Sequence, residues 1–248
     1  MPLTEITMPQ SDLSDIVAIF HKGSDSLTQY FAEQGRSDND MLMAFDEIDK
    51  FLSTAELLLS ESSTDKAQQE LFNERANELI LLIDRLMVFA SQIQHQESFS
   101  HFEEFLFSFC LWFAESGGTI KQLIPIVNLV AALSNRLHDQ EVLKQLLANI
   151  KILIHATEQS IQDDMDDRDP RRPWRVLLLN YAITATRTHD PVLMEKTFQF
   201  LVQNLPDDLK QFFTEGMSQM TAIAYPEHVK EVMEKYYWQY ATQDIKTN

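Results

Sequence analysis

The sequence predicts an all-α protein of antiparallel helical hairpins, stacked as a bundle or as a short repeat array, without a β-sheet. Three observations lead to this fold class. The 248-residue chain has only 5 glycines, whereas the ordinary usage of ~7% gives roughly 17, so few sharp turns are available. No segment sustains the alternation of apolar and polar residues that is typical of strands. Four prolines near the C-terminal end each open a stretch with helical spacing of apolar residues: Pro173, Pro191, Pro206 and Pro226.

These prolines indicate where helices begin, because proline fits the first position of a helix and disrupts its interior. Their spacing of 18, 15 and 20 residues predicts four short consecutive helices that fold back on one another. Upstream, apolar residues three and four positions apart predict further helices. The expected helices cover residues 41–59, 72–93, 99–112 (rich in Phe and closed by Gly117 and Gly118), 123–137 (with Pro125 as a kink or as the true start) and 143–161 (capped by Asp139).

Composition along the chain predicts four regions. Residues 1–40 are polar, and we expect them to be partly irregular, with one short helix near residues 14–20. An acidic helical body follows over residues 41–162. A charged connector rich in Asp spans residues 163–172. The C-terminal helical hairpins, residues 173–248, are expected to pack on the body.

The formal net charge is −18, and it is unevenly distributed. Residues 1–70 carry 4 basic and 14 acidic side chains, whereas residues 171–248 carry 9 of each. An acidic surface repels phosphate backbones and anionic lipids, so the sequence disfavours binding to nucleic acid or to a membrane. It favours a basic protein partner, although acidity that serves only solubility explains the same numbers.

The single cysteine, Cys110, excludes an internal disulfide and a cysteine-based zinc site. Its neighbours Phe109 and Leu111 predict a buried, unreactive thiol. The N-terminus lacks a basic region followed by an apolar run, which is the pattern of a signal peptide. The longest apolar stretch, residues 105–114, is too short to span a bilayer. We therefore expect a cytoplasmic protein.

One part of the C-terminal region resembles a known repeat family. Trp174, Leu177, Tyr181, Phe198 and Pro206 stand at spacings similar to those of the tetratricopeptide repeat. The resemblance covers residues 173–206, and Leu178 and Met194 replace the small residues of the family pattern. It implies stacked helical hairpins with a concave face that binds peptides. An ordinary antiparallel bundle, with Trp174 and Tyr181 as core residues, is the alternative.

Two groups of side chains are candidates for partner binding. The first combines the basic concentration at Arg171, Arg172 and Arg175 with Trp174 and Tyr181. These arginines are suited to an acidic segment or a phosphate group, or else they neutralise the aspartates just upstream. The second group is Tyr237, Trp238 and Tyr240 in the C-terminal run. Consecutive aromatic residues cannot all face one side of a helix, so Tyr237 or Trp238 should be partly exposed unless another chain covers it.

The sequence contains no motif that indicates catalysis, and we expect neither cofactor nor metal. There is no Glu-x-x-His pair, no His-Glu-x-x-His, no nucleophile elbow and no phosphate-binding glycine loop. The Asp-rich connector lacks the central Gly and the terminal Glu of a helix–loop–helix calcium site. The Phe-rich helix over residues 99–112 is expected in the core, with a pocket for a ligand as the alternative.

Together these patterns favour a non-enzymatic cytoplasmic protein–protein interaction module, acting as an adaptor, a chaperone or an inhibitor. The alternative is a helical ligand-binding protein or a metal-dependent enzyme that uses the Phe-rich interior. A third hypothesis is an acidic inhibitor that mimics DNA or masks a basic toxin. The sequence also leaves a homodimer open, since Tyr and Trp are common at interfaces.

Overall fold

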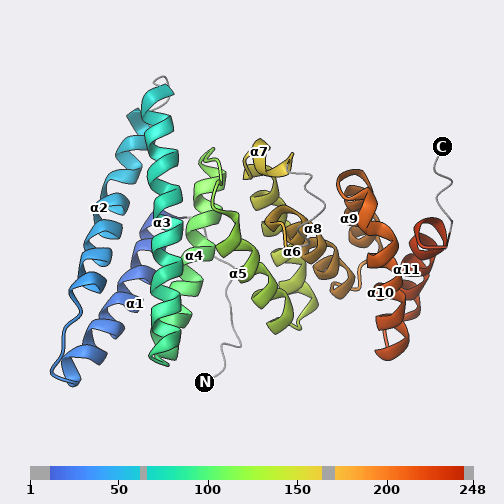
Figure 1. Cartoon of the computed structure of the whole chain (residues 1–248), viewed down its shortest axis with the longest axis horizontal. Helices are drawn as coiled ribbons and strands as arrows, with labels where there is room; N and C mark the ends of the chain where they lie inside the picture. Colours follow the sequence, from blue (N-terminus) through green and yellow to red (C-terminus); the bar gives the residue numbers. More distant parts are fainter. Residues whose placement is uncertain (1–11, 62–65, 164–170, 243–248) are drawn as a thin grey trace. The chain divides into compact units, whose positions relative to one another are not determined.

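A computed structural model describes residues 12–61, 66–163 and 171–242, with the side chains of residues 56–61 left out. The described residues form helices and no β-strand, so the predicted all-α class is confirmed, and the contacts between neighbouring helices fit a helical bundle (Figure 1). The α-helices are α1 (Leu13–Glu33), α2 (Asn39–Glu61), α3 (Lys66–Gln92), α4 (Gln96–Glu115), α5 (Leu123–Arg136), α6 (Gln140–Ala156), α7 (Gln159–Gln162), α8 (Pro173–Arg187), α9 (Pro191–Asn204), α10 (Leu209–Ala222) and α11 (Glu227–Tyr240), with a 3-10 turn, η1 (Pro206–Asp208).

The chain divides into two compact units. The first consists of Met1–Leu129 and Ile152–Asp164, and the second of Val130–Lys151 and Met165–Asn248. This division differs from the one expected at residues 163–172, because most of α6 and the end of α5 belong with the C-terminal helices. The aspartates of that connector lie largely outside the described residues.

The first unit is built around the Phe-rich helix α4. Helices α1 and α3 both pack against α4, and α2 packs against α3, which it accompanies over most of its length (Figure 1). Phe102, Phe105, Phe109 and Phe113 are buried, and α1 and α3 add the rings of Phe20 and Phe72. Gly23 lets α1 approach α4 closely, since a Cβ there would lie 2.9 Å from the Phe102 ring.

The expectation for residues 1–40 was wrong over residues 13–33. Instead of one short helix in an irregular segment, these residues form the 21-residue helix α1. Asp12 caps its first turn by accepting a hydrogen bond from the backbone N–H of Ser14 (2.9 Å). Ile16, Phe20 and Leu27 are buried against the rest of the unit. Burial of this apolar stripe stabilises a helix that the polar composition conceals.

A buried amide fastens the loop after α4 to α3. The Asn77 Nδ2 donates to the carbonyl oxygen of Thr119 (2.9 Å), and its Oδ1 accepts from the backbone N–H groups of Lys121 (2.7 Å) and Gln122 (3.1 Å). Asn77 is 4% exposed. One side chain thus satisfies three backbone groups of a loop, which buried backbone requires.

The helix expected over residues 143–161 ends early, at Ala156. Its end pairs with the loop residue Ile120, whose backbone N–H donates to the carbonyl oxygen of Ala156 (2.8 Å) and whose carbonyl oxygen accepts from Glu158 (2.9 Å). The same backbone groups cannot also continue the helix, so Ile161 lies in the separate short helix α7. The predicted cap is present, because Asp139 accepts from the N–H of Val142 (3.0 Å).

In the second unit, the four prolines stand where helices begin. Pro173 and Pro191 are the first residues of α8 and α9, Pro206 opens η1 just before α10, and Pro226 immediately precedes α11. Helix α8 packs against α9, and α11 packs against both α9 and α10. The described part of the chain contains no helix long and apolar enough to cross a membrane.

Candidate functional site

The C-terminal aromatic run lies on α11, which packs on α9 and α10. Tyr236 faces inward between the rings of Phe198 (5.1 Å between centroids) and Phe213 (5.4 Å). Its hydroxyl donates to the Glu195 carboxylate on α9 (3.1 Å). Burial, with the negative charge of Glu195 as a further cause, raises the pKa of Tyr236 to about 12. The hydroxyl therefore stays protonated and holds α11 to α9.

The next residues on α11 face outward. The Trp238 side chain is 62% exposed, and its ring meets the half-buried Tyr237 edge to face at 5.5 Å. Tyr240 is also half-buried and stacks on Phe213 (6.0 Å). The geometric expectation that Tyr237 or Trp238 is partly exposed is therefore met by both residues.

An ion pair holds the helix that carries this exposed ring. The Lys235 Nζ lies 2.7 Å from Oε1 and 2.9 Å from Oε2 of Glu195, so it bridges α11 and α9. The same ammonium lies 5.4 Å from the centre of the Tyr236 ring. Trp238 thus sits one turn beyond a cross-linked position. We call the exposed Trp238 and the half-buried Tyr237 beside it the α11 aromatic face.

The arginine group divides into separate environments. Arg171 is exposed, whereas Arg172 is buried at the start of α8. The Arg175 Nε donates to Oδ1 of Asp208 (2.7 Å), and both side chains of this pair are largely buried. Asp208 ends the turn η1 before α10, so Arg175 ties α8 to that turn. Sequence spacing gave no sign of this partner, which lies 33 positions away.

Trp174 and Tyr181 belong to the interior. Trp174 is 4% exposed and Tyr181 is 9% exposed. The Tyr181 ring meets Phe200 edge to face at 6.2 Å, and burial raises the pKa of its hydroxyl. Because so little of either side chain reaches the surface, we remove both from the candidate contact residues. Of the group around Pro173, only Arg171 is exposed.

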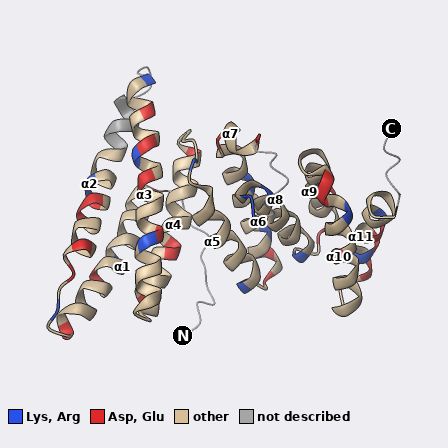
Figure 2. Cartoon of the chain, viewed as in Figure 1, with Lys and Arg blue, Asp and Glu red and all other residues tan. Residues whose placement is uncertain are grey.

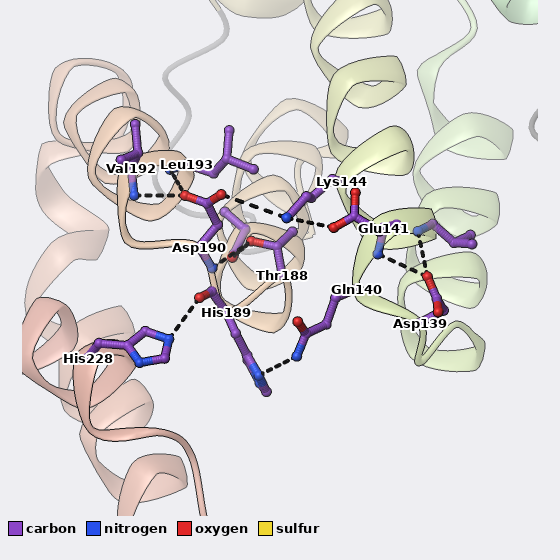
Figure 3. A network of polar contacts seen from close by, with 12 residues as sticks. Asp139, Gln140, Glu141, Lys144, Thr188, His189, Asp190, Val192, Leu193 and His228 are labelled. Carbon is purple, nitrogen blue, oxygen red and sulfur yellow. Dashed lines mark hydrogen bonds and ion pairs between the residues drawn. The ribbon is translucent and has the colours of Figure 1, made fainter.

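A polar network that the sequence did not indicate joins three segments of the second unit (Figure 3). His189, in the turn between α8 and α9, has a left-handed backbone (φ 54°). Its Nδ1 pairs with the Gln140 Nε2 (2.9 Å), and its carbonyl oxygen accepts from the His228 Nε2 of α11 (3.0 Å). The adjacent Asp190 caps α9 by accepting from Val192 (3.0 Å) and lies 3.9 Å from the Lys144 ammonium.

The remaining candidates are Cys110, a possible metal site and the Phe-rich helix α4. Cys110 is buried, and burial raises the pKa of its thiol, which matches the expected unreactive side chain. Among the described residues, no three His, Cys, Asp or Glu side chains gather in a way that would hold a metal ion. The aromatic rings of α4 pack on one another and on Phe20, Phe51 and Phe72.

The chain was compared with protein families, curated proteins and solved structures. No protein-family model, no curated protein and no solved structure matches the chain, so any function has to be argued from its own residues.

Proposed function

We propose that the protein is a non-enzymatic protein–protein interaction module of the cytoplasm, acting as an adaptor, a chaperone or an inhibitor. The observation that carries the proposal is the exposure of Trp238 on the α11 aromatic face. Trp and Tyr supply a large apolar contact area at a small cost in side-chain entropy, and they dominate the binding energy of many interfaces.

The helix that carries Trp238 supports this role because it is already held in place. Glu195 holds both Lys235 and the hydroxyl of Tyr236, and Tyr240 stacks on the core residue Phe213. A partner that covers Trp238 therefore does not have to immobilise α11 itself. Pre-ordered surroundings lower the entropic cost of association.

Charge favours a basic partner. The chain carries a formal net charge of −18, which attracts cationic proteins over a distance set by the ionic strength. This charge lies in residues 1–170, whereas residues 171–248, which include Trp238, carry 9 acidic and 9 basic side chains. It therefore steers a basic partner from a distance rather than at the contact itself. We therefore propose a different protein or a peptide, with basic residues, as the partner.

An affinity capture from a native lysate tests the function. The wild-type protein should retain a specific partner, and Trp238→Ala should weaken its capture by at least about tenfold, a typical loss for a central Trp. Ile223→Ala is the matched control. Ile223 is 52% exposed and directly follows α10, whereas Trp238 lies ~17 Å along α11 from the first residue of that helix, Glu227. The control should bind as the wild type does.

Two results would contradict the proposal. Equal loss in the Trp238→Ala and Ile223→Ala proteins would show that the α11 aromatic face is not the contact. Stoichiometric metal in the purified protein, or a small molecule that raises its melting temperature strongly, would favour the alternative of a ligand-binding protein or enzyme.

A further inference from the structure

An open groove runs between α2 and α3 in the first unit. Its volume is about 940 Å³. Phe51, Leu79 and Leu82 form its apolar floor, and Met43 and Leu71 line it at its two ends. The lining extends from residue 43 to 54 on α2 and from 71 to 85 on α3. At a rise of ~1.5 Å per residue, the groove is therefore ~20 Å long.

These dimensions suit one face of a helix. A helix rises ~1.5 Å per residue, so a partner helix of roughly four turns spans the length of the groove. With its side chains such a helix is ~10 Å across, so one of its faces would lie against the lining between α2 and α3. The exposed half would remain polar, as in other helix-in-groove complexes.

Exposed apolar side chains stand at both ends of the groove. Met43 is 70% exposed and Leu71 is 47% exposed. Burial of such side chains by a partner is favourable, and methionine adapts its shape to different ligands. Together with the floor, they give apolar contacts along the whole length of the groove.

Charged side chains along the two edges of the groove, one edge on α2 and the other on α3, form ion pairs within their own helix. Lys50 pairs with Asp46 along α2, and Arg75 pairs with Glu78 along α3 (3.5 Å). Within the described part of the chain, no ion pair crosses from one edge to the other. The groove lining holds three acidic and three basic side chains, so its own charges balance. These side chains can fix where a bound helix lies along the groove, but they do not select its net charge.

The net charge of the occupant follows from the whole hairpin. Residues 39–92 contain 11 acidic and 4 basic side chains, a net charge of −7, and acidic residues recur along both helices (Figure 2). Such a field attracts a cationic helix. A second copy of this hairpin would bring another −7 to the same surface, so a second copy is disfavoured.

We propose that the groove between α2 and α3 binds a basic amphipathic helix of a partner protein, about 11 to 14 residues long. This inference rests on the proposed interaction function and assigns it a second contact site with a defined partner class. Apolar residues on one face of the partner helix cover Met43, Phe51 and Leu71, while its Lys or Arg residues lie along the acidic hairpin.

Binding of a synthetic peptide tests the inference on the full chain. The probe is a fluorescently labelled amphipathic peptide of about 18 residues made of Leu and Lys. Its binding to the protein is measured by fluorescence anisotropy. The reference peptide has the same composition, but its leucines are distributed around the helix. We expect the amphipathic peptide to bind at least about tenfold more tightly than the reference.

Matched variants locate the binding. Met43→Glu and Leu71→Glu should each weaken binding of the amphipathic peptide by about tenfold or more. Ile124→Glu is the control, since Ile124 is 62% exposed on α5 and does not line the groove. It adds the same charge, so it should leave the affinity within about twofold. Circular dichroism of each variant verifies the fold.

Three outcomes would overturn the inference. Equal binding of both peptides, or equal weakening by Ile124→Glu, would show attraction by net charge alone. A dimer in sedimentation velocity that Met43→Glu dissociates would show that a second copy fills the groove. If the peptide fails while Trp238→Ala still abolishes capture of a lysate partner, the groove inference falls and the interaction function remains.

Discussion

The helices α4 and α11 have similar shares of aromatic residues but differ in environment. In α4 the rings of Phe102, Phe105, Phe109 and Phe113 are all fully buried, whereas α11 buries Tyr236 and exposes Trp238. Helix α4 packs on α1 and on α3, while α11 packs on α9 and α10 through one face. Neighbours, rather than aromatic content, thus decide whether such a helix is core or surface.

The largest expected effect contrasts one ring from each helix. Phe109→Ala should lower the free energy of unfolding by about 3 to 5 kcal/mol, because it leaves a cavity among rings that cannot all close in. Trp238→Ala should change it by less than about 0.5 kcal/mol, as surface substitutions usually do. Urea unfolding followed by circular dichroism measures both values.

Phe109→Leu is the control for this contrast. It retains an apolar side chain of intermediate volume, so it should recover more than half of the loss. A cost for Trp238→Ala that approaches the cost for Phe109→Ala would show that α11 also belongs to a core, and the distinction between the two helices would then fail.

The contrast extends to the backbone, since the buried side chain of Asn77 holds the loop that follows α4. Asn77→Ala leaves the carbonyl of Thr119 and the N–H groups of Lys121 and Gln122 without their side-chain partner. We expect a loss of roughly 2 to 3 kcal/mol in the free energy of unfolding, also measured in urea.

Ser134→Ala in the second unit is the matched comparison for Asn77→Ala. The Ser134 hydroxyl donates to Thr184 (2.7 Å), whose own hydroxyl donates to the carbonyl of Asn180. Its removal deletes one buried hydrogen bond and should cost about 1 kcal/mol. Similar costs for the two variants would mean that water reaches the Asn77 site.

Substitutions at two glycines test how tightly side chains pack beside α4 and beside α11. A Cβ on Gly118 would lie 2.2 Å from the buried ring of Phe113, which has no room to move. Gly118→Ala should therefore cost about 1 to 3 kcal/mol through overpacking. A Cβ on Gly216 of α10 would meet the flexible end of Met233 at 2.6 Å.

Gly216→Ala should be close to neutral. Its helix propensity improves by up to about 1 kcal/mol, which offsets the shift of Met233. Thermal unfolding of both glycine variants measures the difference. A larger loss for Gly216→Ala than for Gly118→Ala would show that the α10–α11 pair is the more tightly packed region.

The sequence was sufficient to predict most of the helices. Proline starts and apolar spacing gave α2 to α5 and α8 to α11, because both signals are local along the chain. Helix α1 was underestimated, since its stripe of Ile16, Phe20 and Leu27 is spread through a polar segment. The end of α6 was misplaced because its cause, the backbone of Ile120, is 36 positions away from Ala156.

The candidate sites were less accessible from the sequence. Exposure on α11 followed from consecutive aromatic residues, a local argument. The burial of Trp174 and the pairing of Arg175 with Asp208 depend on distant residues. The groove between α2 and α3 depends on how far two helices stand apart, a separation that the spacing of apolar residues does not encode. The sequence therefore predicted residues that protrude better than surfaces that several helices form.

The smallest expected effect concerns pH and the polar network of the second unit. Burial, followed by the positive charges of His228 and Arg187, lowers the pKa of His189 from its ordinary value of 6.5. As the pH falls below about 6.5, the unfolded chain binds this proton more readily than the folded chain does, so the free energy of unfolding should decrease. His189→Asn removes the titration and retains a residue that tolerates φ of 54°. The difference in unfolding free energy between wild type and His189→Asn, measured from pH 7.5 to pH 5.5, should therefore change in favour of the variant as the pH falls.

The groups that face His189 are Gln140, Arg187, Tyr225 and His228. None of them is a carboxylate that would reverse the sign, so a wild type that gains stability relative to His189→Asn on acidification would contradict this account of the network.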